Sequence, residues 1–274
     1  MARIGVIGYG FVGKAVVHGF GVSGRHEIRF YDKFVESEGL PAVVAQSDVL
    51  FLCLPTPFKD ERIDLSIMDS VITEISALIT PERSPLLVIK STVIPGTTKK
   101  YAERHPALRF AMNPEFLTEK NYLHDFIHAD RIVIGADDAT AGDELEALYH
   151  QDFPDTPLFR TSATGAEVVK YMANSFLATK VIFANEIFDL CEKLGVDYTS
   201  VKNMVAADPR IGPSHLTIGD DRGFGGKCFP KDLVSFIALF KDLDVDGTLL
   251  ETVWKKNYRI RANHEWEDIP FVKG

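Results

Sequence analysis

The feature that most constrains this chain is a glycine-rich turn close to its N-terminus. Residues 4–7 form a short apolar run typical of a strand, and residues 11–20 carry apolar side chains at helical spacing. Between them stand Gly8, Gly10 and Gly13 in a G-x-G-x-x-G pattern. Gly8 permits a tight turn, Gly10 lets backbone amides approach a pyrophosphate, and Gly13 permits close packing of the helix. Strand, turn and helix together predict a dinucleotide-binding unit.

An acidic residue follows the second predicted strand. The apolar segment 28–31 ends on Asp32, which stands 24 residues after Gly8. A carboxylate there accepts hydrogen bonds from ribose hydroxyls and repels a 2′-phosphate, which favours NAD over NADP. Arg29 and Lys33 lie beside it and leave that preference open. The cofactor contacts predicted at these two sites are Gly8, Tyr9, Gly10, Phe11, Val12, Gly13, Asp32 and Lys33.

Predicted strands and helices alternate over about the first 150 residues. Further apolar segments stand at residues 49–54, 86–89, 108–112 and 131–134, with helical stretches such as 68–79 between them. Such alternation implies right-handed crossovers and a mostly parallel sheet. We therefore expect an α/β fold with an N-terminal NAD-binding domain of Rossmann type over residues 1–160.

The pattern changes to helices alone after residue 160. Residues 165–194 contain no proline and carry apolar side chains at three-four spacing. Thr164 and Glu167 match a capping box, and Gly195 is placed to end the helix. Further helices are expected at 199–206, 231–240 and 248–264, with a long Gly/Asp-rich loop over 208–226. Residues 161–274 are therefore expected to form an all-helical domain.

The last predicted helix favours a partner surface. Trp254, Tyr258 and Ile260 would form an exposed apolar stripe in an isolated monomer, which predicts a homodimer through the helical domain. The alternative is that these side chains pack against the helical domain itself.

Composition excludes several classes of protein. Thirty basic and 39 acidic residues give a net charge of −9, so nucleic-acid binding is not expected. The longest apolar run is residues 49–54, whereas a membrane span needs about 20 residues. The N-terminus shows no signal-peptide pattern, so we expect a cytoplasmic protein. Three scattered cysteines predict neither a disulfide framework nor a metal site.

Several segments resemble the UDP-glucose/GDP-mannose dehydrogenase family. They are Leu54-Pro-Thr-Pro, Lys90-Ser-Thr-Val-Ile-Pro-Gly-Thr, Asn113-Pro-Glu-Phe-Leu-Thr-Glu, Lys170-x-x-x-Asn174, and Gly223-Phe-Gly-Gly-Lys-Cys-Phe-Pro-Lys-Asp. The resemblance implies oxidation of the primary alcohol of a nucleotide sugar to a carboxylate, with UDP-glucose as the leading substrate candidate. Family members use two NAD⁺ and a covalent thioester on the matching cysteine. They usually continue into a third, nucleotide-binding domain, which we expect to be absent here, so the sugar and the base stay open.

The chemistry of the cysteine segment supports that resemblance. Cys228 precedes Pro230 and is flanked by Lys227 and Lys231, so a helix N-terminus and two lysines should favour its thiolate. A thiolate can attack an aldehyde, and the hemithioacetal can then lose a second hydride. Asp232 stands one helical turn after Cys228, where it is expected to order a water or hold Lys170.

Two further pairs are spaced for catalysis. Lys170 and Asn174 stand four apart on one predicted helix, where an ammonium and an amide can stabilise a developing alkoxide. Glu115 and Glu119 would share a face if the segment around Phe116 is helical. By resemblance, Glu115 directs the hydrolytic water at the thioester, and Glu119 contacts the cofactor or orients its neighbour.

The resemblance implies a role for each matched residue. The catalytic set is Cys228, Lys170, Asn174, Asp232, Glu115 and Thr56. Additional cofactor contacts are Pro55, Thr56, Thr92, Glu119 and Lys231. Substrate contacts are Glu115, Phe116, Leu117, Lys170, Asn174, Arg210, Phe224, Gly225 and Cys228. In many family members the arginine matching Arg210 reaches the sugar nucleotide across a dimer.

Two other functions remain open. The β-hydroxyacid dehydrogenases resemble this chain in length, in their Rossmann and helical domains and in Lys-x-x-x-Asn, but they remove only two electrons and have no use for Cys228. A non-catalytic NAD-binding module is the other alternative. The Cys228 segment favours the four-electron oxidation over the first alternative. The presence of Lys170, Asn174, Cys228 and Asp232 together argues against the second.

Overall fold

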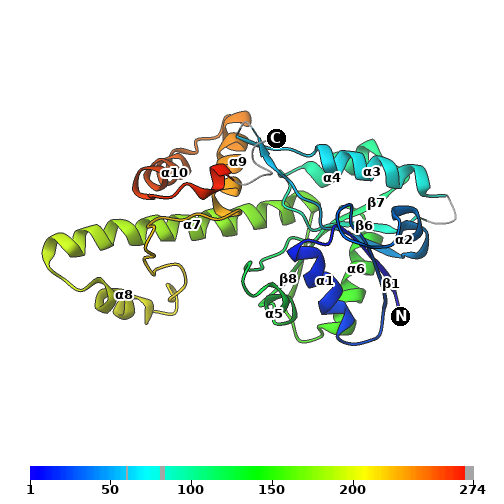
Figure 1. The fold of residues 1–274 in the computed structure, drawn as a ribbon, viewed down its shortest axis with the longest axis horizontal. Helices are drawn as coiled ribbons and strands as arrows, with labels where there is room; N and C mark the ends of the chain where they lie inside the picture. The colour runs from blue at the N-terminus through cyan, green and yellow to red at the C-terminus, as the bar shows by residue number, and fades with distance from the viewer. Residues whose placement is uncertain (60, 81–83, 269–274) are drawn as a thin grey trace. The chain divides into compact units, whose positions relative to one another are not determined.

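The structure is a computed structural model and describes residues 1–59, 61–80 and 84–268. It divides into two compact units, drawn in Figure 1. Unit 1 comprises Met1–Thr56 and Asp64–Lys170, and unit 2 comprises Pro57–Ile63 and Tyr171–Gly274. The division falls inside a helix, after Lys170. The domain boundary expected at residue 160 stays a prediction.

Unit 1 is built on a seven-stranded sheet of order β2-β1-β3-β6-β7-β8-β9. The strands are β1 (Arg3–Ile7), β2 (Glu27–Tyr31), β3 (Val49–Leu52), β6 (Leu86–Ile89), β7 (Arg109–Met112), β8 (Ile132–Gly135) and β9 (Leu158–Thr161). Neighbouring strands pair in parallel, except β7 and β8, which are antiparallel at Met112 and Gly135. Every residue of β3, β6 and β8 is buried, as expected for a parallel sheet covered on both faces. The predicted α/β class with a Rossmann-type sheet is confirmed, although β9 was not predicted.

Helices cover both faces of this sheet (Figure 1). One face carries α1 (Phe11–Gly21), α5 (Tyr122–Ile127) and α6 (Ala139–Asp152), and the other carries α2 (Leu40–Gln46), α3 (Ser66–Leu78) and α4 (Thr97–Arg104). Alternate residues of β3 enter opposite cores, since Leu50 and Leu52 face one and Val49 and Phe51 the other.

Helix α7 (Ala163–Leu194) begins in unit 1. The Ser162 hydroxyl accepts a hydrogen bond from the Gly165 amide at 3.0 Å, so Ser162 caps the helix. The predicted capping box of Thr164 and Glu167 is wrong because Glu167 points elsewhere.

The buried Glu167 carboxylate caps a different helix, α4. It accepts hydrogen bonds from the Gly96 amide, from the Thr98 amide at 2.8 Å and from the Thr98 hydroxyl at 2.6 Å. A carboxylate at a helix N-terminus is favoured by the orphan amides and the helix dipole. Burial nevertheless raises the pKa of Glu167. The first turns of α7 are thus tied to unit 1.

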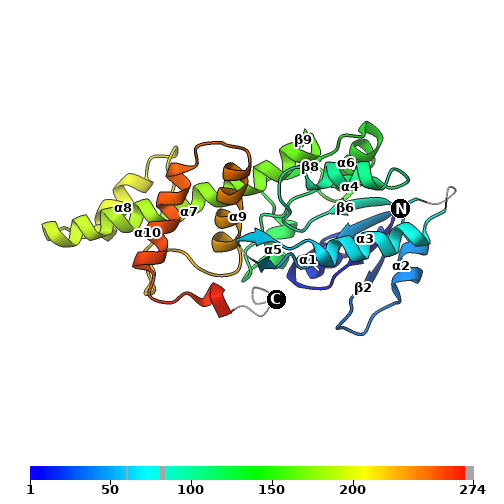
Figure 2. The ribbon, with the colours of Figure 1, turned by 90° about the horizontal axis from the view of Figure 1, so that it is seen from above.

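Unit 2 contains a short hairpin and the remaining helices. These elements are β4 (Phe58–Lys59), β5 (Arg62–Ile63), the rest of α7, α8 (Tyr198–Ala206), α9 (Phe229–Asp242), α10 (Thr248–Ile260) and η1 (Glu265–Asp268). Figure 2 shows α9 and α10 beside α7. Their shared core includes Ala178 and Ile182 of α7, Ile237 of α9 and Val253 of α10. Among the described residues, none of the helices combines the length and hydropathy that crossing a bilayer requires.

The stripe predicted on the last helix is mostly covered. Trp254 and Ile260 pack against the core of unit 2, while Tyr258 is 50% exposed. The packing alternative therefore holds for two of the three residues.

A longer apolar stripe lies on α7. Its members are each at least half exposed and recur every four or seven residues: Met172, Phe176, Phe183, Leu190 and Leu194. Such a row of large exposed apolar side chains is a candidate interaction surface.

Candidate active site

The glycine turn forms a cradle at the start of α1. Gly8 has a φ of +96°, and its amide donates to the Tyr31 carbonyl at 2.8 Å. A Cβ on Gly8 would lie 2.5 Å from the Cys53 carbonyl oxygen, and one on Gly13 would lie 1.9 Å from the Gly8 carbonyl oxygen. In the described chain no atom lies within 4 Å of a Cβ placed on Gly10, and no side chain caps α1. The open space and the uncapped amides fit a pyrophosphate.

Asp32 lies at the end of β2 and faces the turn. Its Oδ2 accepts from the Tyr9 amide at 2.7 Å and its Oδ1 from the Phe34 amide at 2.8 Å. A carboxylate has about four acceptor positions, so capacity remains for two ribose hydroxyls. One terminal nitrogen of Arg29 donates to both carboxylate oxygens of Glu38 at 3.0 Å, and this ion pair partly neutralises the charge that could attract a 2′-phosphate. The site therefore fits NAD.

The other predicted cofactor contacts of unit 1 follow neighbouring strands. Phe11 and Val12 are half-buried in the first turn of α1, Lys33 is exposed after β2, Pro55 and Thr56 follow β3, and Thr92 follows β6. Because β1, β3 and β6 are parallel neighbours, these residues lie at one edge of the sheet. The Ser91 hydroxyl donates to the Leu54 carbonyl at 2.7 Å and so fixes the loop after β3.

Glu115 and Lys170 form a buried ion pair in unit 1. The Lys170 Nζ donates to Glu115 Oε1 and to the Glu115 carbonyl, both at 2.8 Å. Glu115 Oε2 accepts from the Leu117 amide at 2.7 Å, and the Phe116 ring centroid lies 5.8 Å from Lys170 Nζ. This arrangement places a carboxylate and an ammonium together after β7.

The segment around Phe116 is not helical. Residues 113–118 are irregular, Glu119 is exposed in a turn, and Glu115 is buried, so the condition on which the two glutamates would share a helix face is not met. The physical reason is that the Glu115 carboxylate bonds the Leu117 amide, a local contact that competes with helix formation.

Sequence reasoning missed a buried polar cluster next to this pair. Lys90 Nζ donates to Asn113 Oδ1 at 2.7 Å, and Tyr149 Oη lies 3.4 Å from the same Nζ. Asn113 Nδ2 donates to the Val133 carbonyl at 2.7 Å. Burial lowers the pKa of Lys90 to about 8. Lys90 and Asn113 each follow a predicted strand, and only their shared sheet edge could have indicated that they meet.

Cys228 begins a helix in unit 2, as predicted. It occupies the N-cap position of α9 and is half-buried, and its carbonyl accepts from the Asp232 amide at 2.9 Å. The other two cysteines differ, since Cys53 and Cys191 are buried and burial raises the pKa of Cys53 to about 12. Of the three thiols, Cys228 therefore has the environment that suits a nucleophile.

Asp232 connects α9 to α7. Its Oδ2 accepts from Asn174 Nδ2 at 2.6 Å, and its Oδ1 accepts from Lys231 Nζ at 2.5 Å. Lys231 therefore pairs with a carboxylate, which reduces the support that it was expected to give to the Cys228 thiolate. Lys170 and Asn174 lie one turn apart on α7, as predicted. That Asp232 orders a water or holds Lys170 stays a prediction.

The loop before Cys228 is held by polar clamps that the sequence did not reveal. Fully buried Asn257 accepts from the Phe224 amide at 2.7 Å and donates to the Phe224 carbonyl at 3.0 Å. The Gly226 amide donates to Glu265 at 2.9 Å. The Phe224 ring is buried in the core of unit 2, whereas Gly225 is half-buried. Substrate contact by Phe224 and Gly225 stays a prediction.

Arg210 lies in the long loop with its side chain 87% exposed. Its guanidinium pairs with Asp208 through Nε at 3.0 Å and a terminal nitrogen at 2.6 Å. A substrate phosphate would have to compete with this local pair, so the predicted contact stays a prediction.

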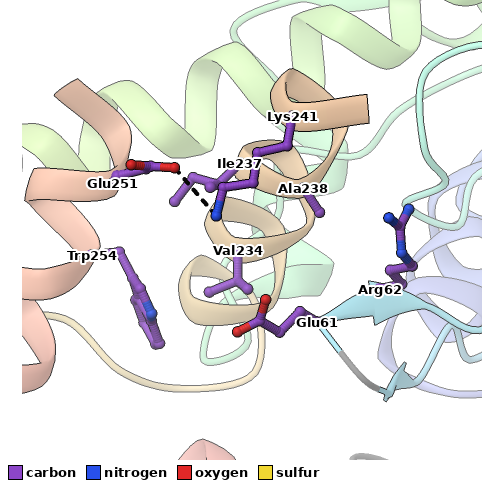
Figure 3. A pocket seen from close by; sticks show the side chains of 8 residues that line it. All are labelled: Glu61, Arg62, Val234, Ile237, Ala238, Lys241, Glu251 and Trp254. Atoms are coloured by element: carbon purple, nitrogen blue, oxygen red, sulfur yellow. Dashed lines mark ion pairs between the residues drawn. The ribbon is translucent and has the colours of Figure 1, made fainter. Parts of the chain in front are cut away.

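Unit 2 contains a pocket of about 400 Å³ (Figure 3). It is lined by Glu61 and Arg62 of the hairpin, Val234, Ile237, Ala238 and Lys241 of α9, and Glu251 and Trp254 of α10. Lys241 and Glu251 form an ion pair across it at 3.2 Å. None of the predicted site residues lines it. The described residues also contain no cluster of three or more side chains suited to a metal ion.

Comparisons with known proteins identify the family of this chain. The model of the "UDP-glucose/GDP-mannose dehydrogenase family, NAD binding domain" matches residues 27–152, and the model of that family's central domain matches residues 164–259. A UDP-glucose 6-dehydrogenase of Rickettsia bellii is 36% identical over 242 residues, which cover 85% of this chain and 53% of that protein. The chain thus spans about half the length of the curated relatives it matches.

Solved structures extend the likeness. A UDP-glucose dehydrogenase of the archaeon Pyrobaculum islandicum is 32% identical, with a TM-score of 0.85 over 94% of this chain and 68% of that one. A 3-hydroxyisobutyrate dehydrogenase of Mycobacterium tuberculosis is 18% identical with a TM-score of 0.75, which shows a shared fold alone. NAD is the cofactor that the matched NAD-binding domain implies. The chain belongs to the UDP-glucose/GDP-mannose dehydrogenase family.

Proposed function

We propose that this chain oxidises a nucleotide sugar at C6 to the uronic acid through a thioester on Cys228. UDP-glucose is the leading substrate candidate. The observation that carries the proposal is the place of Cys228, half-buried at the N-cap of α9. A two-electron β-hydroxyacid dehydrogenase has no use for a cysteine there. The full activity is proposed from relatives about twice as long as this chain.

The cofactor is held by unit 1. Amides of the glycine turn bind the pyrophosphate, and Asp32 binds the adenosine ribose. Thr56 and Thr92 follow β3 and β6 at the same sheet edge. When bound there, NAD⁺ would supply the hydride acceptor, with one NAD⁺ consumed for each of the two oxidations.

The first oxidation requires a stabilised alkoxide. The Lys170 ammonium and the Asn174 amide supply the positive charge and the hydrogen-bond donor. Both are held in advance, Lys170 by Glu115 and Asn174 by Asp232. Such preorganisation reduces the reorganisation needed when charge develops.

The second oxidation passes through Cys228. Its thiolate, supported by the N-terminus of α9, attacks the aldehyde carbon and forms a C–S bond. Oxidation of this hemithioacetal gives the thioester. Each Glu115 oxygen keeps lone-pair capacity beyond its present bonds, so Glu115 can take a proton from the water that releases the acid and restores the thiol.

The count of reduced cofactor per product tests this function. Wild-type protein is incubated with NAD⁺ and a panel of UDP- and GDP-sugars, and NADH and acid are measured. We expect two NADH per acid and no released aldehyde. One NADH with a free carbonyl product would favour β-hydroxyacid chemistry. NAD binding without turnover of any substrate in the panel would favour a non-catalytic module.

We also propose that the chain forms a homodimer through the apolar stripe of α7. The exposed row from Met172 to Leu194 supports this proposal, and exposed Arg210 would then be placed to reach a second subunit. Light scattering at low micromolar concentration should give a dimer that Phe183→Asp converts to monomer. A clean 30.5 kDa wild-type monomer that turns over substrate would contradict it.

A further inference from the structure

A buried lysine in unit 1 has no part in the chemistry above. Lys90 is 3% exposed, and among the described residues its ammonium bonds only neutral groups, Asn113 Oδ1 and Tyr149 Oη. The Phe126 ring centroid lies 5.5 Å from its Nζ. Burying an ammonium without a bonded carboxylate costs stability. Its presence therefore points to a role other than holding the fold together.

Lys90 fixes the side chain of Asn113. Asn113 Oδ1 accepts from Lys90 at 2.7 Å and also from the Tyr149 hydroxyl. Asn113 Nδ2 donates to the Val133 carbonyl, and its backbone amide donates to the Ile89 carbonyl at 2.9 Å. These bonds come from α6, β8 and β6, so Asn113 is held from three elements.

Asn113 begins the segment that carries Glu115. Only Pro114 stands between them, and its ring restricts the backbone. Glu115 then meets Lys170 through both its carboxylate and its carbonyl. The charges of Glu115 and Lys170 also act on Lys90, the first raising and the second lowering the pKa of Lys90. All these groups belong to unit 1.

We propose that Lys90 is a positioning residue that, through Asn113, sets the place of the Glu115 carboxylate against Lys170. Its catalytic meaning rests on the proposed function, whereas the positioning itself does not. Two measurements separate these claims.

The first measurement needs no turnover. Unfolding of Glu115→Gln, Lys170→Met and the double variant gives the coupling between the two residues, and the cycle is repeated in Lys90→Met. We expect Lys90→Met to fold and to melt at the wild-type temperature or above it. The coupling between Glu115 and Lys170, expressed as a ratio of unfolding constants, should be at least threefold smaller in this background. Tyr149→Phe leaves Lys90 on Asn113 and should keep most of the coupling. Lys100→Met, at an exposed lysine of α4, is the matched control and should change nothing.

The second measurement follows acid formation. Lys90→Met should lower kcat by about 10- to 100-fold with little change in KM, as expected when a reacting group is displaced. Added to Glu115→Gln, it should lower the rate no further, because it acts through Glu115.

Three results would overturn the positioning role. They are an unchanged coupling, a Lys90→Met chain that fails to fold, and rate losses that multiply in the double variant. If the wild type forms no acid from any sugar, the proposed function fails, and the unfolding cycle still decides whether Lys90 positions Glu115.

Discussion

Unit 1 and unit 2 hold their predicted catalytic groups in different ways. In unit 1, Glu115 follows β7 beside β6 and β8, whose side chains are fully buried. In unit 2, Cys228 follows a loop held by single side chains, chiefly Asn257 and Glu265. Apolar burial is spread over many residues, whereas each polar clamp is one residue. The cofactor half should therefore tolerate substitution near its site better than the cysteine half.

The strongest test of this contrast is Cys228→Ala. It removes the nucleophile of unit 2 and leaves unit 1 intact, so acid formation should fall about 10³-fold or more while the NAD Kd stays unchanged. Slow reduction of supplied aldehyde with NADH should persist, because Lys170 and Asn174 remain. Acid formed at the wild-type rate would show that the thioester reading is wrong.

The stability of the chain should depend on pH through Lys90, which follows β6 in unit 1. The pKa of Lys90 is about 8 in the folded chain and 10.5 when unperturbed, so the unfolded chain binds more protons between these values. Stability from this group is therefore lowest below pH 8 and rises toward pH 10.5, by about 3 kcal/mol.

The measurement compares wild type with Lys90→Met. Urea unfolding at pH 7.5 and pH 10 is measured for both chains. Burial raises the pKa of Cys53 while the charge of Lys90 lowers it, so the difference between the chains reports Lys90 together with its effect on Cys53. Identical pH profiles for the two chains would remove Lys90 as the cause.

Asn257→Ala tests the polar clamp of unit 2. The substitution leaves the amide and the carbonyl of buried Phe224 unpaired, so stability should fall by about 2 kcal/mol. Acid formation should slow because Cys228 follows this loop, while NAD binding should not change. Asn203→Ala, at an exposed position of α8, is the control. Equal losses of NAD affinity and turnover would break the contrast between the units.

Alanine substitutions at Gly10 and Gly13 distinguish an effect on cofactor binding from an effect on folding. Their effects should be the smallest of those predicted here. Gly10→Ala meets no described atom, so the melting temperature should hold while the NAD Kd rises about tenfold from the obstructed pyrophosphate. Gly13→Ala meets the Gly8 carbonyl and should lower the melting temperature as well. Unchanged NAD affinity in Gly10→Ala would place the pyrophosphate elsewhere.

The sequence predicted best where one local pattern decides the structure. The glycine turn, Asp32 after β2 and Cys228 at the start of α9 each rest on neighbouring residues. The prediction of a capping box at Thr164 was wrong because the Glu167 carboxylate accepts hydrogen bonds at the start of α4, about 70 residues away in the chain.

Long-range contacts explain the remaining gaps. Asn257 and Phe224 stand 33 residues apart, and Lys90 and Asn113 stand 23 apart. No spacing rule links such pairs, because packing of whole strands and helices brings them together. For the same reason, Glu115 was identified from a motif, but its partner Lys170, 55 residues along the chain, and its buried setting were not.

Because two of the three cysteines are buried, covalent probes of thiols should react with the native chain mainly at Cys228. Burial raises the pKa of Cys53 to about 12, and Cys191 lies 5% exposed on α7. Alkylating dyes react with thiolates that solvent can reach, so mild labelling should concentrate on Cys228. Cellular oxidants would find the same sulfur first. A reporter group could therefore be attached at Cys228 of the unmodified sequence, and oxidation at the same residue would inactivate the protein.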